Sequence, residues 1–416
     1  MRHFLTYFTA LFLSLSSLHS QNFGAGTAFR DITPDPLLPV SGGVGVPQPA
    51  HILKGRLSVR VMAFSSNGEI LVVVGIDNLG WPAWLGDQTR KYFPEIPLEN
   101  ILIGATHTHS APDAYGFPDE NGKPSSDQEY LAFCIQQMAE AIKEALDNIR
   151  PAYLKIAVGE AEGKIAYNYY APRLYDPRCG VIQALDASND QVIGTLVNYA
   201  IHPEVLGPRQ GILSPDLCGP LYDQIESRVG GVALFINGAQ GGMVTADNRR
   251  EGDREDQTWE ECERIGRLLA DEALRIVDTA KAQSQPILSI HSVQTTFPVT
   301  SPLMKQIMDA TGLGDRNEDG YTVSTTLTMV DLGTSRILTI PGEALPNIGY
   351  YLKRKMGVPH PFLFGLTNDA YGYILTKEDY DSFERYSYIT RTSLGEQTGE
   401  ILTSTYEDLI KSHPRN

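Results

Sequence analysis

The hydrophobic pattern of the chain alternates short apolar runs with longer segments of helical periodicity. Five of the short runs are rich in β-branched residues and are bounded by Gly, Pro, His or Asn, which is typical of buried β-strands. They cover residues 70–76, 101–104, 192–201, 232–236 and 336–340. We therefore expect each of these runs to lie inside a sheet.

Two longer segments, residues 126–149 and 258–277, place their apolar residues on one stripe, as an amphipathic α-helix does. Each begins with a capping box, in which a Ser or Thr is followed three residues later by a Glu. The pairs are Ser126 with Glu129 and Thr258 with Glu261. A third helix is expected after Pro341, since Pro346 is tolerated in a first turn. Strands mixed with helices predict an α/β or α+β protein, with mixed β-sheets covered by helices.

The N-terminus predicts export. Residues 1–20 have a basic start, an apolar run and small residues up to Ser20, which is the pattern of a cleaved signal peptide. No later stretch approaches the roughly 20 apolar residues of a membrane span. We expect the mature chain, residues 21–416, to be periplasmic or extracellular and to lack a transmembrane segment. It contains no repeat, low-complexity tract or linker, and its length fits either one large domain or two tightly fused ones.

Charge and cysteine content argue against some classes of binding partner. The chain has 34 basic and 50 acidic residues, a formal net charge of -16, which opposes nonspecific binding to nucleic acid or anionic lipid. There are four cysteines and no metal-type Cys-x-x-Cys spacing. Cys134 and Cys262 fall within helical patterns, where a small buried thiol is expected.

Residues suited to metal binding follow the predicted strands. Run 101–104 leads to His107 and His109, run 192–201 to His202, and run 336–340 to Glu343. Sites in open α/β sheets lie at the carboxyl ends of strands. Two histidines at i and i+2 on an extended backbone point to the same side, so their rings can share one ion. Imidazole with a carboxylate forms a ligand set suited to zinc.

Structural explanations exist for the same residues. A single histidine at a strand end is commonly a hydrogen-bonded structural residue, and this applies to His202. Glu343 fits equally as a carboxylate in the first turn of a helix, where the helix dipole favours it. Spacing alone does not join the three segments.

The order of these motifs resembles that of the neutral ceramidases, zinc amidases that cleave the amide bond of N-acylsphingosine. The histidine signature Thr-His-Thr-His-Ser at 106–110 is the most specific match. The other similar segments are Gly-Ala-Gly-Thr-Ala at 24–28, Asp-Ile-Thr-Pro at 31–34, Ala-Ile-His at 200–202, Pro-Gly-Glu at 341–343, and the tyrosine-rich stretch 365–386. The resemblance spans most of the mature chain.

The resemblance implies one Zn²⁺ per chain, with a water completing the ligands His107, His202, Glu343 and Tyr373. It places His109 and Tyr386 at the amide carbonyl or the developing oxyanion. Asp216 matches a family Ser-Gly-Asp segment, and we expect it to orient a ligating histidine, with a general base as the alternative catalytic role. Zinc lowers the pKa of a bound water towards ~7, which suits attack on an amide carbonyl. The residues alone leave His107, His109 and His202 as an alternative ligand set.

Some residues depart from the family pattern. The family Asp and Ser of a Gly-Asp-x-Ser-Pro segment are replaced by Gly242 and Val244, with Thr245 as the nearest hydroxyl. A family arginine is missing near Asn168, where Arg173 is the nearest substitute. The resemblance implies that residues 21–416 form a catalytic domain, without the immunoglobulin-like C-terminal domain that members of the family carry.

The sequence thus predicts an exported zinc-dependent amide hydrolase acting on N-acylsphingosine or a related small N-acyl compound, including one presented by a membrane. Two alternatives stay open: a zinc hydrolase of another small amide or ester, and a non-catalytic binding protein with a metal clip. A serine hydrolase is disfavoured, because no Gly-x-Ser-x-Gly motif occurs.

A second metal motif is weaker. Residues 315–320 match the first half of a calcium-binding loop, but the twelfth position is Thr326 instead of Glu. A polar surface turn is the preferred interpretation, with Ca²⁺ as the alternative.

Overall fold

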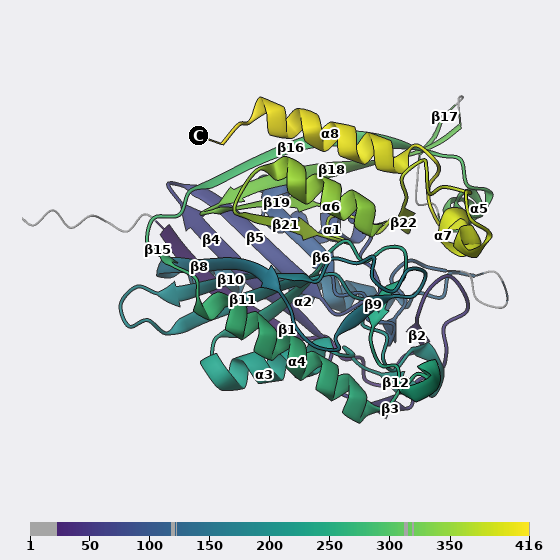
Figure 1. Cartoon of the computed structure of the whole chain (residues 1–416), viewed down its shortest axis with the longest axis horizontal. Coiled ribbons are helices and arrows are strands. Elements are labelled where there is room, and N and C mark those ends of the chain that lie inside the picture. The colour runs from purple at the N-terminus through teal and green to yellow at the C-terminus, as the bar shows by residue number, and fades with distance from the viewer. Residues whose placement is uncertain (1–22, 118–120, 122, 312–314, 318–319, 416) are drawn as a thin grey trace, which may run out of the picture.

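The computed structural model describes residues 23–415 except 118–120, 122, 312–314 and 318–319, so the expected signal peptide at 1–20 lies outside it. Two β-sheets pack face to face, and helices cover both outer faces (Figure 1). The expected α/β architecture of mixed sheets covered by helices is therefore confirmed. No helix among these residues is both long and apolar enough to span a bilayer.

The larger sheet has nine strands, with β13 and β6 at its two ends. Only the pairs β11–β13 and β5–β6 are parallel. In spatial order the strands are β13 (Val232–Asn237), β11 (Val192–Tyr199), β10 (Arg178–Asp186), β8 (Arg150–Glu160), β1 (Phe23–Asp31), β4 (Ser58–Ser66), β5 (Glu69–Ile76) and β6 (Ile101–Ala105), with β15 (Ala282–Gln283) added on β8.

The smaller sheet has five strands, and its only parallel pair is β19–β21. They are β16 (Leu288–Val299), β18 (Gly320–Leu332), β19 (Ser335–Thr339), β21 (His360–Phe364) and β17 (Asp315–Asn317), which pairs with β18. Four two-stranded pairs complete the described strands: β2 (Val40–Ser41) with β7 (Ala111–Pro112), β3 (Ile52–Leu53) with β12 (Ile212–Leu213), β9 (Ala166–Asn168) with β14 (Val244–Ala246), and β20 (Glu343–Ala344) with β22 (Tyr373–Ile374).

Side chains alternate between two cores along the central strands. In β4, Val59, Val61 and Ala63 pack against the helices outside the sheet. Met62 and Phe64 lie in the core between the two sheets. Because successive residues of a strand point to opposite faces, a continuous apolar run is required where both faces are covered.

Helices cover the outer faces of both sheets. Over the larger sheet lie α1 (Ala83–Arg90), α2 (Gln128–Asp147), α3 (Cys218–Val229) and α4 (Trp259–Asp278). Over the smaller sheet lie α6 (Pro346–Met356) and α8 (Thr398–Ser412), with the shorter α5 (Pro302–Thr311) and α7 (Ser387–Arg391) beside one end. The 3₁₀ turns are η1 (Leu98–Asn100), η2 (Pro208–Gln210), η3 (Glu251–Asp253) and η4 (Glu384–Tyr386).

The N-cap residues of α4 and α2 can be compared with the predicted capping boxes. Thr258 caps α4 by accepting a hydrogen bond from the backbone N–H of Glu261, as expected. The prediction for α2 is wrong by one residue, because Asp127 is the cap and accepts from the N–H of Tyr130 at 2.9 Å. Asp and Ser are equally good cap residues, so Ser126 followed by Asp127 gave two possible registers.

Three smaller expectations concern the cysteines, the end of one strand and the segment considered for calcium. All four cysteines are buried free thiols. The expected strand 192–201 ends earlier, at Tyr199, where the chain turns towards His202. In the segment considered for calcium, residues 315–317 pair with β18 in a hairpin, Thr326 lies within that extended strand, and residues 318–319 fall outside the described chain.

Candidate metal centre

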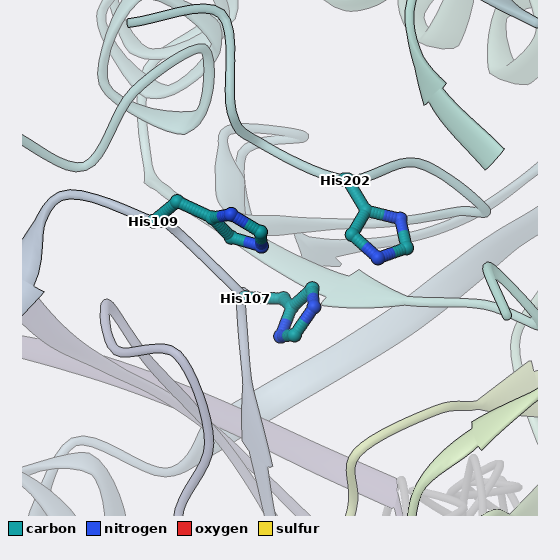
Figure 2. A group of neighbouring side chains, drawn as sticks. All are labelled: His107, His109 and His202. Atoms are coloured by element: carbon teal, nitrogen blue, oxygen red, sulfur yellow. The ribbon is translucent and has the colours of Figure 1, made fainter. Parts of the chain in front are cut away.

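Three histidines from two segments meet at the carboxyl ends of the strands. His107 and His109 follow β6, and His202 follows β11. Figure 2 shows the three imidazole rings turned towards a common space. Their ligand atoms lie within 4.8 Å of one another, and all three side chains are buried. Among the described residues, this is the group of His, Cys, Asp and Glu side chains that meets the geometry for metal binding.

The backbone brings the His107 ring into the site in a way that the sequence argument missed. His107 has φ of +73°, a left-handed conformation that is rare for residues other than glycine. The expected extended His-x-His backbone is therefore wrong. The rings of His107 and His109 converge nearly perpendicular, at 87°, with centroids 4.9 Å apart. Strain of this kind is retained where the surrounding structure enforces it, commonly at functional sites.

Each imidazole has its Nδ1 held by an acceptor outside the cluster. Nδ1 of His107 lies 2.6 Å from the carbonyl oxygen of Leu79, and Nδ1 of His202 lies 2.8 Å from that of Val244. A carbonyl oxygen only accepts, so Nδ1 carries the proton in both rings. Nδ1 of His109 lies 3.2 Å from the carboxylate of Glu204. This arrangement directs the Nε2 atoms inwards, as the outer partners of metal-binding histidines do.

Glu343 in β20 meets these Nε2 atoms. Its Oε2 lies 3.0 Å from Nε2 of His202 and 3.4 Å from Nε2 of His107. With Nδ1 protonated, each neutral ring presents a lone pair to an oxygen that also only accepts. A shared proton or a cation is needed between them. Nε2 of His109 is buried and has no hydrogen-bond partner among the described residues. The donor set and this unpaired atom fit a metal such as zinc.

The pKa shifts follow from the same contacts. Burial would lower the pKa of His202, but the hydrogen bond to Glu343 and the charge of Glu204 outweigh it and raise the pKa to about 9. Burial would raise the pKa of Glu343, but His107 and His202 hold it below its usual range. Burial lowers the pKa of His109 well below its usual value, and the two other histidines lower it further. Glu343 is thus ionised and His109 neutral at pH 7.

Asn237 ties the two histidine segments together. It ends β13, and its side-chain amide donates to the carbonyls of Thr106 at 3.0 Å and Ile201 at 2.7 Å. Its amide oxygen accepts from the N–H of Ile201 at 3.2 Å. These bonds fix the residues directly before His107 and His202. No local pattern in the sequence indicates this role.

Asp216 also acts on the backbone. Its carboxylate accepts from the N–H groups of Val205 at 3.2 Å, Leu206 at 2.9 Å and Leu217 at 2.8 Å. Burial raises the pKa of Asp216 to about 6, although these bonds oppose the shift. The carboxylate therefore fixes the chain after His202 and reaches the metal centre through that segment.

The metal centre opens into a cavity of about 600 Å³. His107, His109 and Glu343 line its polar part. The remaining wall is largely apolar and includes Leu79, Trp84, Phe117, Met304, Ile307 and Val323. A concave apolar pocket with a few convergent polar groups is the usual form of a small-molecule site.

The tyrosines divide between the cavity and the protein interior. Tyr373 lines the cavity in register with Glu343, and its hydroxyl donates to Sδ of Met243 at 3.2 Å. Tyr386 instead packs on Tyr170, with ring centroids 5.0 Å apart. Tyr388 belongs to the group of tyrosines that the sequence offered as the lining of a substrate pocket, and it lines the cavity.

The two residues considered as substitutes, Thr245 and Arg173, lie outside the described cavity wall. Thr245 is in β14 and pairs with His202 through an isolated β-bridge. Its neighbour Val244 provides the carbonyl oxygen that is hydrogen-bonded to Nδ1 of His202. Arg173 is exposed. The structure thus places neither side chain in the cavity wall that it describes.

Buried histidines and a carboxylate at an apolar cavity define a candidate metal site in an α/β protein. Two solved structures share the fold. One is the neutral ceramidase from Pseudomonas aeruginosa, with a TM-score of 0.75, 16% identity, and coverage of 95% of this chain and 75% of that one. The other is a ceramidase complexed with C2, with a TM-score of 0.74, 17% identity, and coverage of 95% and 76%.

The chain therefore has the fold of neutral ceramidase, as its sequence motifs predicted. No protein-family model matches the sequence, and no curated protein matches it. A shared fold does not by itself determine function, which depends on the residues that line the site.

Proposed function

We propose that this chain is an exported zinc-dependent amide hydrolase that acts on an N-acyl compound. The observation that carries the proposal is the contact of Oε2 of Glu343 with Nε2 of both His107 and His202. The carboxylate oxygen and the two ring nitrogens converge beside an apolar cavity, and this contact is favourable only with a proton or a metal cation between them. The neutral ceramidase fold supports the reaction class.

His107, His202 and Glu343 would hold the zinc. The sequence motifs name Tyr373 as a further ligand, and His109 is the alternative. When bound, zinc lowers the pKa of water towards ~7 and polarises a carbonyl. Closed coordination by protein atoms alone would instead indicate a structural metal clip.

The other residues at the cavity would bind and orient the substrate. The hydroxyls of Tyr373 and Tyr388 both line the cavity. Burial raises the pKa of Tyr388 to about 12, so its phenol stays protonated and can donate to an amide carbonyl or to the oxyanion that forms from it. We assign to Tyr388 the role that the family motif suggested for Tyr386. Asp216 and Asn237 position the histidine segments.

The apolar wall suits an acyl chain. Leu79, Phe117 and Met304 offer no hydrogen bonds beyond their backbone, so they favour the hydrocarbon part of the substrate. The amide would then lie at the histidines. Ceramide and shorter N-acyl compounds both meet this description, including lipids presented by a membrane.

Metal analysis and a substrate panel test the proposal. The chain lacking residues 1–20 is purified and its metal is quantified. Release of amine is measured from ceramide and from short amides, and release of alcohol is measured from short esters. We expect about one zinc per chain, as a single mononuclear site holds. His107→Ala should lose both metal and hydrolysis, while Glu95→Gln, an exposed change before β6, should keep both.

Each outcome has a defined meaning. Full hydrolysis by metal-free protein would overturn the mechanism. Cleavage of short amides but not ceramide would keep the mechanism and discard the sphingolipid substrate. Export is tested separately by finding the mature N-terminus near residue 21 in the periplasm or medium; an uncleaved cytoplasmic chain would overturn it.

A further inference from the structure

We propose that Asp369 makes the cavity selective for charge, so that the enzyme takes N-acyl compounds that are uncharged or cationic and rejects anionic ones. This inference rests on the proposed function and names the substrate class of the same site. It concerns the cavity wall and not the metal ligands.

Asp369 is a buried carboxylate in that wall. It lines the cavity and is 5% exposed. Its Oδ1 accepts from the backbone N–H of Ala83, the first residue of α1, at 3.1 Å and from that of Ala370 at 2.9 Å. The hydroxyls of Tyr371 and Thr325 hydrogen-bond to the same carboxylate. A carboxylate accepts about four hydrogen bonds, so neutral donors hold this group in one position.

No cation balances the charge of Asp369 within the wall. The described residues that line the cavity include no lysine or arginine. Arg90 lies near Asp369, but its guanidinium donates to Asp87 at 2.9 Å and does not line the cavity. Arg391 lies over the ring of Tyr388 and is exposed, where water and salt screen its charge. Buried charges are normally paired, so an unpaired one at a cavity indicates a role towards the ligand.

The metal centre does not supply the missing positive charge. The carboxylates of Glu343 and Glu204 both meet histidines of the cluster and would balance the two charges of a zinc ion. Histidines that bind a metal are neutral. Asp369 is then the formal charge that nothing balances among the described residues of the wall.

The charge is present at neutral pH and acts in apolar surroundings. Burial raises the pKa of Asp369 to about 6, although its hydrogen bonds oppose that shift, so the carboxyl is mostly ionised at neutral pH. The same wall contains Met304, Ile307 and Val323. Charges interact more strongly in such a site than in water. An anionic group of the substrate is therefore repelled there, and an ammonium group is attracted.

The variant Asp369→Asn separates charge from shape. Its amide oxygen can still accept from Ala83 and Ala370, and its amide N–H groups can donate to the two hydroxyls, which accept as well as donate. The variant thus removes the charge and keeps α1 attached. Asp87→Asn is the matched control, because it makes the same change in α1 at a side chain that is 55% exposed and outside the cavity wall.

Two matched series of substrates test the proposal. In the first, lauroyl amides contain neutral ethanolamine, cationic ethylenediamine or anionic glycine; in the second, the charge is at the far end of the acyl chain. In the series whose charged group reaches Asp369, we expect kcat/KM of the anionic member to be about 10–100-fold below that of the neutral one. The cationic member should equal or exceed the neutral one. Asp369→Asn should remove most of the gap, mainly through KM, and Asp87→Asn should preserve it.

Equal kcat/KM for the neutral and anionic members of both series would overturn the inference, as would an unchanged gap in Asp369→Asn. Hydrolysis of no member would instead overturn the proposed function, and calorimetric binding of the same compounds would still test the charge preference. Thermal midpoints show whether Asp369→Asn is folded. If it is not, Met304→Lys adds a cation to the same wall and should admit the anionic members; their continued rejection would overturn the inference.

Discussion

Nε2 of His202 lies 3.0 Å from Oε2 of Glu343, while Nδ1 of the same ring donates to the carbonyl of Val244. The contact is favourable only with a positive charge between the two inner atoms. In the metal-free chain a proton fills this role, and in the proposed enzyme a metal ion does.

Metal removal should lower thermal stability. A ligand that binds only the native state stabilises it by about 4 kcal/mol at a thousandfold excess over its Kd. We expect chelation to lower the thermal midpoint by several degrees, and added Zn²⁺ to restore it. Differential scanning calorimetry checks this, with His107→Ala as the variant that should not respond. An unchanged midpoint in the wild type would contradict the metal site.

The metal-free chain should lose stability as the solution becomes alkaline. The pKa of His202 is raised from 6.5 to about 9 in the folded state, so proton binding favours folding. This contribution is complete below about pH 6.5 and is lost as the pH rises through 9. Urea unfolding between pH 6 and pH 9 measures the effect. The slope should be reduced in His202→Gln and in zinc-loaded protein; an equal slope in all three would refute its assignment to His202.

Gly241 should tolerate no side chain. A Cβ at this position would lie 2.1 Å from the carbonyl oxygen of Glu343, a backbone atom that cannot rotate away. We expect Gly241→Ala to cost about 1–3 kcal/mol of unfolding free energy and to weaken zinc binding, since Glu343 must move. Gly252→Ala is the matched control: it has φ of +76° and open space, so it should cost ~1 kcal/mol and leave zinc binding unchanged. Normal zinc affinity in Gly241→Ala would show that this contact does not hold Glu343 in place.

Asn237→Ala should loosen both histidine segments. The change leaves the carbonyls of Thr106 and Ile201 without their donor in the interior. Each unsatisfied buried group costs ~1–3 kcal/mol, so we expect about 2–6 kcal/mol of lost stability for the two carbonyls, together with weaker zinc binding. Chemical unfolding and zinc titration measure the two effects. Asn189→Ala, in an exposed turn, should leave zinc affinity unaffected; loss of stability in Asn237→Ala with intact affinity would limit Asn237 to a structural role.

Substitutions of Tyr388 and Tyr386 should have different effects on kcat. Tyr388→Phe removes a hydroxyl from a residue of the cavity wall, and we expect kcat to fall by about 100-fold or more, as for loss of one oxyanion donor, with little change in KM. Tyr386→Phe alters a residue packed on Tyr170 and should change kcat by less. The reverse order of effects would restore the family assignment of Tyr386.

The sequence predicted the fold where the signal was local. Buried runs and the helix pattern that begins at Thr258 depend on periodicity and capping, which neighbouring residues determine. The histidines and Glu343 were found because strand ends gather at one edge of a sheet. Glu204 and Asn237 were not, since their roles come from contacts between segments that are distant in the sequence; Asn237, for example, is 131 positions from Thr106. Glu204 had one usable signal, its position two residues after His202.

The cavity joins parts of the chain with different constraints. Its histidines and Glu343 lie at strand ends in the buried centre. In contrast, Met304, Ile307 and Met308 belong to α5, a short helix beside the sheets. Residues in α5 can therefore vary in size without disturbing the histidines and Glu343. If the proposed function holds, selection for a new acyl group acts on this helix and leaves the proposed metal site unchanged, so that substrate preference and catalytic competence evolve separately.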